Sequence, residues 1–458
     1  MQRKDFINLT SLGLLSVPFY SFRNNLLSGK SKKVIIIGAG MAGAAAANAL
    51  RSAGTEVTVL EARNRIGGRI HTDHSMGLPI DLGAAWIHKP TNNPLIKLSG
   101  DFKVATQETN YFSLKLYEPN GNSVNKLRLL SPSVKISKAV KQGVAFLQSS
   151  DADYSIAEIL QRTIDKNELS KKEKMLMDFL EGTVENSLAC GLNSASARAY
   201  LDHKEDTKKD RLVTGGYHKI VDNLLKDIDV KLSQPVKVIS QDTGGVKVIT
   251  DSHEFEGDYA IVTIPISLLQ NNVVEFFPSL PKEKINAINS IKMGLMNKTV
   301  MKFTEKFWKN DKHLWGLLGE DNKNNNIILN NHPFNKQPIL TVLSVNKAAY
   351  TLEKTIFTRG ETGRQEIITK WKNTFHKIFP GRNIEIEDMI TTQWHGDRFS
   401  NGSYSHVPVG VSMNAFDVIA APLNRIHFAG EATIAQHHSY THGAYLSGLR
   451  EANRILNF

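Results

Sequence analysis

The stretch KKVIIIGAGMAGAAAANALRSAGTEVTVLEARNRIGGR, residues 32–69, decides the fold of this chain. Its apolar run at residues 34–37 predicts a strand that is buried on both faces. Three glycines follow in the G-x-G-x-x-G spacing: Gly38, Gly40 and Gly43. This spacing lets the backbone turn tightly, approach a pyrophosphate and pack a helix closely on the strand. The stretch therefore predicts the start of a dinucleotide-binding unit.

A helix and a second strand complete this unit. The alanine-rich residues 41–53 predict a helix whose N-terminal N–H groups would face the phosphates. Residues 56–60 predict the second strand, and Glu61 stands at its end. A carboxylate at this place accepts hydrogen bonds from ribose hydroxyls, and it disfavours the 2′-phosphate of NADP.

The composition is that of an ordinary globular protein. The chain has 458 residues, of which 41% are hydrophobic and 22% charged, so we expect two or three domains. Its net charge of +11 comes from scattered lysines and arginines, so we expect no nucleic-acid partner. A single cysteine, Cys190, excludes an intrachain disulfide and a cysteine-rich zinc site. The adjacent His437 and His438 lack spaced partners, so we expect no metal.

The N-terminus, residues 1–31, has the layout of an export signal. Basic residues, Arg3 and Lys4, precede a short apolar region at residues 9–20. The order resembles a twin-arginine signal with lysine in the second arginine position, which implies export of a folded protein to the bacterial periplasm. An ordinary secretory signal, a retained anchor or a cytoplasmic protein are the alternatives. No apolar run reaches the ~20 residues of a membrane-spanning helix.

Four stretches together resemble the FAD-dependent amine oxidases of the monoamine and polyamine type. They are EARNRIGGRIHT (61–72), DLGAAWIHKP (81–90), QWHGDRFSNGSYSHVPVG (393–410) and RIHFAGEATIAQHHSYTHGAYLSGLREANRIL (425–456). The resemblance extends over about residues 32–458, and it is looser between about 99 and 390.

The resemblance implies an α/β fold with two interleaved domains. We expect a discontinuous, Rossmann-like FAD-binding domain of the GR2 type, formed by residues 32–98, 208–288 and 386–458. We expect an α+β substrate domain formed by residues 99–207 and 289–385. Helical spacing of apolar residues around 134–149 and 171–189 agrees with helices in the substrate domain.

The resemblance also implies the residues that would bind FAD. These are Gly38, Gly40, Gly43, Glu61, Arg63, Gly68, Arg69, Ala84, Ala85, Trp86, Val236, Trp394, Gly430, Glu431, Gly443 and Ala444. The helix that begins near Gly443 would direct its N-terminus to the flavin ring. Monoamine oxidases attach FAD through a cysteine, and Ser403 stands at that position here, so we expect non-covalent FAD.

The stretch GLMNKTVMKF, residues 294–303, has a lysine in an apolar, β-branched strand. Because the side chains of a strand alternate between its two faces, Lys298 and Lys302 would lie on the same face. If that face is exposed to solvent, both lysines would be solvated. In the resembled family, a lysine of this strand hydrogen-bonds a water that bridges to flavin N5. The resemblance places Lys298 at that position and leaves Lys302 as a surface lysine.

Two tyrosines match the aromatic cage of the resembled family, Tyr404 and Tyr440. Two aromatic faces across a slot would orient an amine toward the flavin. By the same resemblance His88 lies beside the substrate channel. Polyamine oxidases commonly have glycine after this histidine, whereas Lys89 stands here, which argues against a polyamine substrate.

The expected function is the FAD-dependent oxidation of a primary or secondary amine by O2. A hydride would pass from the α-carbon to flavin N5, the imine would hydrolyse, and O2 would become hydrogen peroxide. One alternative is an L-amino-acid oxidase with Arg398 as carboxylate clamp. Others are a carotenoid- or porphyrinogen-type FAD oxidoreductase and a non-catalytic FAD-binding partner protein. The substrate and the oligomeric state stay open.

Overall fold

The computed structural model describes residues 31–124, 130–202 and 209–457. Apart from Ser31, the export signal predicted for residues 1–31 lies outside the described residues. Residues 32–458 form one compact unit. Among the described residues, none of the helices is both long enough and apolar enough to cross a membrane.

A parallel sheet carries the dinucleotide motif. Within the described residues its strand order is β22 (Ile426–Phe428), β13 (Tyr259–Val262), β1 (Lys33–Ile37), β2 (Glu56–Leu60) and β9 (Asp229–Lys231). Strand β1 pairs in parallel with β13 and β2, so both of its edges are hydrogen-bonded. The strands predicted at residues 34–37 and 56–60 are therefore confirmed.

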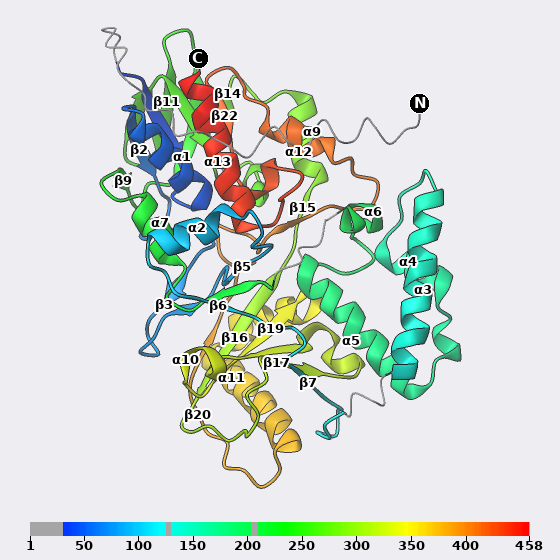
Figure 1. The fold of residues 1–458 in the computed structure, drawn as a ribbon. Coiled ribbons are helices and arrows are strands. Elements are labelled where there is room, and N and C mark those ends of the chain that lie inside the picture. The colour runs from blue at the N-terminus through cyan, green and yellow to red at the C-terminus, as the bar shows by residue number, and fades with distance from the viewer. Residues whose placement is uncertain (1–30, 125–129, 203–208, 458) are drawn as a thin grey trace. The chain divides into compact units, whose positions relative to one another are not determined.

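The sheet is the middle of three layers, because alternate residues of β1 face different neighbours. Val34 and Ile36 pack with α1 (Met41–Ser52), α13 (Thr441–Leu456) and α7 (His218–Leu224). Ile35 and Ile37 pack with a second sheet, in the order β12 (Glu254–Gly257), β11 (Val246–Thr250), β10 (Val236–Gln241) and β14 (Glu275–Phe277). Figure 1 shows this arrangement, which confirms the α/β fold class.

Helix α1 lies side by side with α13 in close contact (Figure 1). Its residues Ala44–Ala47 are fully buried, and a Cβ added at Gly448 of α13 would stand 2.1 Å from the carbonyl oxygen of Ala42. Glycine and alanine thus permit the two backbones to approach. The helix predicted at residues 41–53 is confirmed to within one residue.

A second region is built on a mostly antiparallel sheet. Its order is β20 (Ile386–Thr391), β16 (Met296–Phe303), β19 (Ile339–Val345), β18 (Ile327–Asn330), β17 (Leu314–Leu317) and β7 (Leu114–Tyr117). Helix α11 (Asn346–Ile378) covers one face through Trp371 and Phe375. Strand β20 lies beyond the predicted boundary at residue 385, so this sheet extends into the stretch assigned to the FAD-binding domain.

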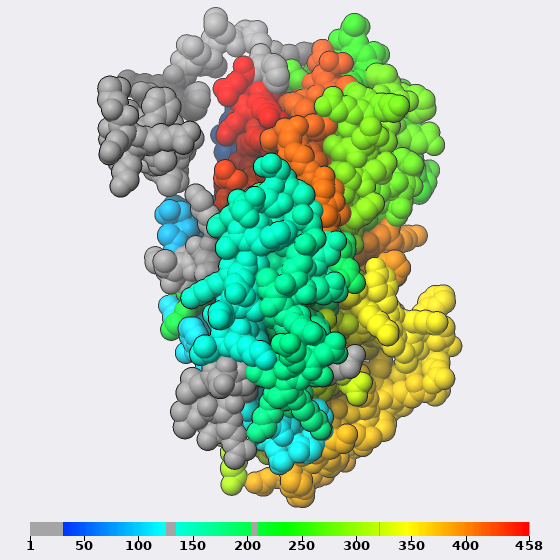
Figure 2. All heavy atoms as spheres, turned by 90° about the vertical axis from the view of Figure 1, so that its right-hand side faces the viewer, coloured from blue at the N-terminus to red at the C-terminus, as the bar shows by residue number. Residues whose placement is uncertain are grey.

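A helical segment adjoins this region. It comprises α3 (Leu130–Ser149), α4 (Ile156–Thr163), α5 (Lys171–Leu188) and α6 (Ala197–Leu201). Helices α4 and α5 each begin with a capping box, formed by Ser155 with Glu158 and by Ser170 with Glu173. In Figure 2 the segment occupies the middle of the face that is shown. The predicted helical pattern is therefore confirmed.

Short elements complete the described chain. The remaining helices are α2 (Pro94–Asp101), α8 (Ile266–Gln270), α9 (Lys282–Ser290), α10 (His332–Asn335) and α12 (Asn414–Ala420). The 3-10 turns are η2 (Lys166–Glu168), η3 (Glu320–Asn325) and η4 (Glu431–Thr433). The remaining strands are β3 (Thr72–Asp73), β4 (Ile80–Asp81), β5 (Trp86–Ile87), β6 (Thr106–Glu108), β8 (Arg211–Val213), β15 (Lys292–Met293) and β21 (Ser405–His406).

We expect the substitution Gly43→Ala to destabilise the fold. A Cβ at Gly43 would lie 1.9 Å from the carbonyl oxygen of Gly38 and 3.2 Å from Cγ2 of Ile36, so α1 would be forced away from β1. Thermal denaturation should show a loss of at least about 2 kcal/mol in the free energy of unfolding. The control is Gly100→Ala in α2, because an added Cβ there meets no atom within 4 Å. That variant should be unchanged or up to about 1 kcal/mol more stable, and an equal loss in both would contradict the packing argument.

Candidate functional site

The glycine-rich turn and the start of α1 have the features of an anion site. Gly38 has a φ of +107°, and Gly40 is the N-cap of α1 without a side-chain capping bond. The first turn of α1 has no acidic residue, so its N–H groups and helix dipole favour a phosphate. A Cβ at Gly40 would meet no protein atom closer than 3.9 Å, so the backbone there borders open space. These features fit a dinucleotide pyrophosphate.

Glu61 lies against this turn. Its carboxylate accepts hydrogen bonds from the N–H of Ala39 at 2.8 Å and the N–H of Arg63 at 2.9 Å. The N–H of Gln234 donates to the carbonyl oxygen of Glu61, so the chain that leads into Val236 runs beside it. Glu61 and Val236 thus lie on one side of the glycine turn, as a ribose and adenine site requires.

Arg63 is held mainly by protein groups. Its guanidinium forms two hydrogen bonds with the carboxylate of Asp397, at 2.7 and 2.8 Å, and one with the hydroxyl of Ser400 at 2.9 Å. A bidentate pair of this kind is strong and directional. Most of the donors that we assigned to FAD are therefore engaged with Asp397 and Ser400, and the Arg63 side chain links two stretches of the site.

Arg69 and Glu431 form the central ion pair of the site. Nη1 of Arg69 lies 2.8 Å from Oε1 of Glu431 and also donates to the carbonyl oxygen of Ser403 at 2.9 Å. Oε2 of Glu431 accepts from the hydroxyl of Ser405 and from the N–H of Ser439. Burial raises the pKa of Glu431, but Arg69 and the Ser405 hydroxyl outweigh burial and hold this pKa below its usual value.

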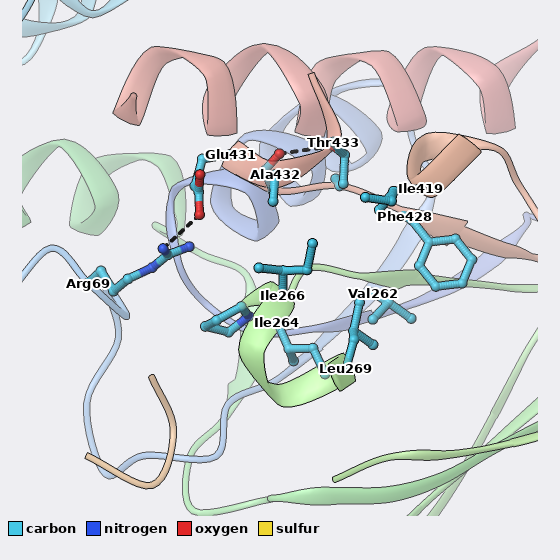
Figure 3. Close-up of a pocket in the computed structure, with 13 residues that line it drawn as sticks. Arg69, Val262, Ile264, Ile266, Leu269, Ile419, Phe428, Glu431, Ala432 and Thr433 are labelled. Atoms are coloured by element: carbon cyan, nitrogen blue, oxygen red, sulfur yellow. Dashed lines mark hydrogen bonds and ion pairs between the residues drawn. The ribbon is translucent and has the colours of Figure 1, made fainter. Parts of the chain in front are cut away.

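A pocket opens beside this pair. Figure 3 shows Arg69 and Glu431 at one end of it, with Ile264, Ile266 and Leu269 along the wall. A Cβ at Gly430 would meet only the carbonyl oxygen of Thr263, at 4.0 Å, whereas a Cβ at Gly38 would meet the Thr263 hydroxyl at 2.6 Å. The two glycine-rich ends of the chain thus meet at Thr263.

Lys298 is buried and holds the loop that follows β4. Its Nζ donates to the carbonyl oxygens of Asp81 and Gly83, both at 2.7 Å, and lies 5.7 Å from the centre of the Trp86 ring. Burial lowers the pKa of Lys298 to about 8, although the Asp81 carboxylate opposes this shift. Burial in turn raises the pKa of Asp81 to about 6. Lys298 is 6% exposed, so the alternative prediction of a half-exposed strand with two solvated lysines is wrong.

The reason is the position of β16 inside its sheet. It pairs with β19 on one edge and β20 on the other. Val300 packs on Ile80 and Leu82, whereas Met301 packs in the core under α11, so both faces are covered. Lys302 remains near the surface, where its Nζ lies 3.0 Å from the carboxylate of Glu387.

The small residues of the loop bring it close to other parts of the site. A Cβ at Gly83 would lie 1.8 Å from the carbonyl oxygen of Arg69 and 3.3 Å from the Trp394 ring. The N–H of Ala84 donates to the same Arg69 oxygen, and Ala85 accepts from Val213. The loop therefore brings Lys298, Arg69 and Trp394 together.

The two predicted cage tyrosines come from different segments. Tyr404 donates its hydroxyl to the carbonyl oxygen of Asn186 in α5 at 2.8 Å. Tyr440 is the N-cap of α13, and its ring stacks on His442 at 5.2 Å between centres. Burial raises the pKa of both phenols, with Tyr440 reaching about 12, and Tyr440 adds to the shift at Tyr404. The two hydroxyls are neutral at ordinary pH and lie within electrostatic range of one another.

The first turn of α13 contains Gly443 and Ala444. A Cβ at Gly443 would lie 1.9 Å from the carbonyl oxygen of His437, so only glycine permits this close approach. The first turn has no acidic residue, and no side chain caps it. Its dipole therefore presents partial positive charge beside Tyr440.

His88 belongs to a polar cluster beside Tyr440. Its Nδ1 lies 2.6 Å from the carboxylate of Asp210, and its ring lies 5.5 Å from that of Tyr440. Asp210 also accepts from the Tyr111 hydroxyl at 2.8 Å and from the Lys89 N–H at 3.0 Å. The structure thus brings His88 to Tyr440, and it adds Asp210, which sequence reasoning missed.

Three further positions bear on the predictions. The hydroxyl of Ser403 accepts from the N–H of Met296 and donates to the carbonyl oxygen of Met296, both at 2.8 Å. The cysteine Cys190 is buried in another cluster. Arg398 is exposed, and its guanidinium lies 4.5 Å from the centre of the Phe399 ring. The guanidinium of Arg63 lies 5.5 Å from the centre of the same ring. Arg398 therefore lies with Arg63 rather than with the cage tyrosines. Among the described residues, no three or more histidine, cysteine, aspartate or glutamate side chains are placed so that they could hold a metal ion together.

Sequence reasoning also missed Asn297. Its side chain is fully buried, donates to Glu353 at 2.7 Å and accepts from the N–H of Trp394 at 3.1 Å. The signal was present, because a polar amide beside a lysine in an apolar strand is unusual. Asn297 thus positions Trp394 beside the loop.

The comparisons with known proteins agree with this geometry. Residues 41–456 match the family described as flavin containing amine oxidoreductase. The chain is 30% identical to polyamine oxidase 4 of Oryza sativa subsp. japonica, over 92% of this chain and 88% of that protein. It is 29% identical to polyamine oxidase 2 of Arabidopsis thaliana, over 92% of this chain and 88% of that protein. It is also 31% identical to lysine-specific histone demethylase 1 homolog 2 of Arabidopsis thaliana, over 94% of this chain but 59% of that longer protein.

These matches confirm the resemblance to the flavin amine oxidases and with it FAD as the cofactor. The open backbone at Gly40 and the carboxylate of Glu61 fit such a cofactor. The roles of the individual residues toward FAD stay predictions.

We expect the substitution Arg69→Lys to weaken FAD binding. Lysine keeps the charge that Glu431 needs, but its flexible stem does not hold an ammonium at the place from which Nη1 of the rigid guanidinium donates to both Glu431 and Ser403. Titration of the apoprotein with FAD, followed by flavin fluorescence, should show a Kd about tenfold higher. The matched control is Arg398→Lys, which should bind FAD like the wild type. Equal affinities in all three proteins would contradict this role of Arg69.

Proposed function

Because this chain belongs to the family of flavin-containing amine oxidoreductases, we propose that it is an FAD-dependent oxidase of a small primary or secondary amine. The single observation that carries the proposal is the buried Lys298, whose ammonium is held by the loop that places Trp86 and Trp394. Burying an ammonium this deeply costs free energy. Buried groups with a shifted pKa occur mostly at functional sites, so a role of Lys298 at an FAD site explains why it is buried.

Bound FAD would supply the redox chemistry, taking a hydride from the carbon beside the amine nitrogen and passing the electrons to O2 to form hydrogen peroxide. The oxidised amine is an imine, which water hydrolyses to a carbonyl product and a smaller amine or ammonia. The chain's own residues then have to bind the amine, orient it and keep water away. No described side chain has to act as a strong base in this scheme.

The two tyrosines would bind and orient the amine. Their raised pKa values keep both phenols neutral, so their rings remain apolar walls with an electron-rich face. The Tyr404 hydroxyl is tied to Asn186, so that ring has a fixed place. A neutral or charged amine between two such rings would be held by packing and by cation–π attraction.

Lys298 would bind a water or an acceptor atom of the cofactor. An ammonium has three N–H donors, and the carbonyl oxygens of Asp81 and Gly83 engage two of them. The remaining donor can hold a water at a constant distance from the loop. A positive charge there also favours electron-rich forms of a neighbouring group.

The relatives support an amine as substrate. Their names describe polyamine oxidases and histone demethylases, and those activities are statements about those proteins. The amino-acid-oxidase alternative loses support, because Arg398 lies against Phe399 and Arg63 rather than beside Tyr404 or Tyr440.

The first test is the visible absorption of the FAD-loaded protein under nitrogen. Spermidine, tyramine, benzylamine and several L-amino acids are added one at a time. We expect one class of amine to bleach the flavin band within seconds to minutes, and air to restore the band while hydrogen peroxide accumulates. A flavin that none of these compounds bleaches would overturn the proposed oxidase.

The second test concerns Lys298 in the reaction with O2. Lys298 has a pKa lowered to about 8, so it loses its proton as the pH rises through that value. If its charge assists reoxidation, the wild-type rate should fall as the pH rises from 7 to 9. Photoreduced protein mixed with oxygenated buffer reports this step without any amine, so substrate ionisation does not interfere.

The variant Lys298→Met should be slower by about tenfold at pH 7, and its rate should not vary with pH over this range. The control is Lys302→Met on the same strand, which should behave like the wild type. A Lys298→Met protein with bound FAD and an unchanged pH profile would return Lys298 to a purely structural role.

A further inference from the structure

Glu353 of α11 is a buried carboxylate that binds N–H donors from two other segments. The residue is 6% exposed. Its Oε1 accepts from the side-chain amide of Asn297 in β16 at 2.7 Å and from the N–H of His395 at 2.9 Å. Its Oε2 accepts from the N–H of Gly396 at 2.8 Å. Helix α11, strand β16 and the turn that follows β20 therefore meet at one side chain.

The hydrogen bonds of Asn297 fix the orientation of its amide. Its Oδ1 accepts from the N–H of Trp394 at 3.1 Å and from the hydroxyl of Thr392 at 3.0 Å. Its Nδ2 therefore points to Glu353, so all three groups that bind this carboxylate are donors. Both oxygens of residue 353 thus have to accept, and an ionised carboxylate is the side chain that does so.

The same face of α11 also contacts the ring of Trp394. Ala349 precedes Glu353 by four residues, so their side chains lie on one face of the helix. Ala349 is fully buried and packs with Leu295 and Trp394. The Trp394 ring also reaches the loop that follows β4, because a Cβ added at Gly83 would lie 3.3 Å from its Cζ2. One helix face therefore contacts both the ring of Trp394 and the backbone that carries it.

The packing of α11 on its sheet comes from other residues. Ile367, Trp371 and Phe375 of the helix share one buried cluster with residues of β16 and β19. Burial of a carboxylate costs free energy, and its hydrogen bonds offset that cost. What Glu353 contributes is direction, because two consecutive backbone N–H groups of the turn have to point at its two oxygens.

We propose that Glu353 is a positioning residue of the flavin site, which sets the place of the Trp394 ring through Asn297 and the backbone of the turn. This inference rests on the FAD site of the proposed function, because Trp394 must lie beside the flavin. Without the carboxylate, the N–H groups of His395 and Gly396 lose their acceptor, and the turn shifts. A displaced ring weakens FAD binding and changes the aromatic surroundings of the flavin.

The test compares Glu353→Gln with the wild type. Glutamine keeps the shape of the side chain, but in either orientation its NH2 group faces a donor of Asn297, His395 or Gly396. Titration of the apoprotein with FAD gives the Kd, and visible circular dichroism of the bound flavin reports the groups around it. We expect a Kd about tenfold higher and an altered circular dichroism of the flavin band.

Two control variants on α11 separate positioning from stability. Glu361→Gln changes an exposed carboxylate of the same helix and should behave like the wild type. Phe375→Leu shortens a fully buried side chain in a cluster that does not contain Trp394. This variant should lower the midpoint of thermal denaturation and leave both the Kd for FAD and the flavin circular dichroism unchanged.

A double variant locates the effect at Trp394. In Trp394→Leu the ring that Glu353 is proposed to place is absent. Adding Glu353→Gln to this variant should therefore change the Kd for FAD by less than about twofold. An equal factor in both backgrounds would mean that Glu353 does not act through Trp394, and it would overturn the proposal.

Glu353→Asp is the conservative variant. It keeps the charge but shortens the reach, so its Kd for FAD should lie between those of the wild type and Glu353→Gln. If Glu353→Gln does not fold, Glu353→Asp is compared with the wild type, and we expect a Kd about threefold higher. Unchanged Kd and circular dichroism in the folded variants, or the same change in Phe375→Leu, would overturn the positioning role.

These measurements use no amine, so the two proposals fail separately. A flavin that no amine bleaches, in a protein whose FAD binding still depends on Glu353, would overturn amine oxidation and leave the positioning role standing. A wild type that binds no FAD would overturn both.

Discussion

The ammonium of Lys298 connects strand β16 with the loop that follows β4, beside the predicted flavin site. It comes from β16, an interior strand of its sheet, and donates to two carbonyl oxygens of a loop that lies against Arg69 and Trp394. A buried ammonium needs such partners, because leaving it unpaired would cost several kcal/mol or force it to lose its proton. The loop carbonyls thus stabilise the charge, and the charge fixes the loop. This mutual dependence fixes the position of the loop relative to β16.

A second chain of contacts continues from the loop to the C-terminal helix. The carbonyl oxygen of Arg69 accepts from Ala84, its guanidinium pairs with Glu431, and Glu431 accepts from Ser439 next to the cage tyrosine. The link between Arg69 and Glu431 joins segments that lie 362 positions apart in the sequence. Because Glu431 is buried and its charge is neutralised by Arg69, displacing either side chain would leave an unpaired ion. The glycine turn, the loop and the start of α13 are therefore held as one unit.

Polar side chains gather beside Tyr440, one of the two tyrosines predicted to bind the amine. Asp210 holds His88, Tyr111 and the backbone of Lys89 in place, and Lys89 in turn lies over Tyr440. Family membership limits the reaction more closely than it limits the substrate.

The sequence by itself determined the dinucleotide-binding unit and the helical segment. Strand β1, helix α1 and strand β2 agree with the prediction because their signals are local, namely glycine spacing, apolar runs and helical periodicity. Only the tertiary structure decided the environment of single side chains. The periodicity of two in β16 suggested a solvated Lys298, but the side chain is buried because a loop 217 positions away in the sequence covers that face. Arg63 likewise pairs with Asp397, which is 334 positions away, and Asp210 reaches His88 across 122 positions. Charge, burial and pKa depend on neighbours in space, and no local pattern of residues specifies which distant segment will provide them.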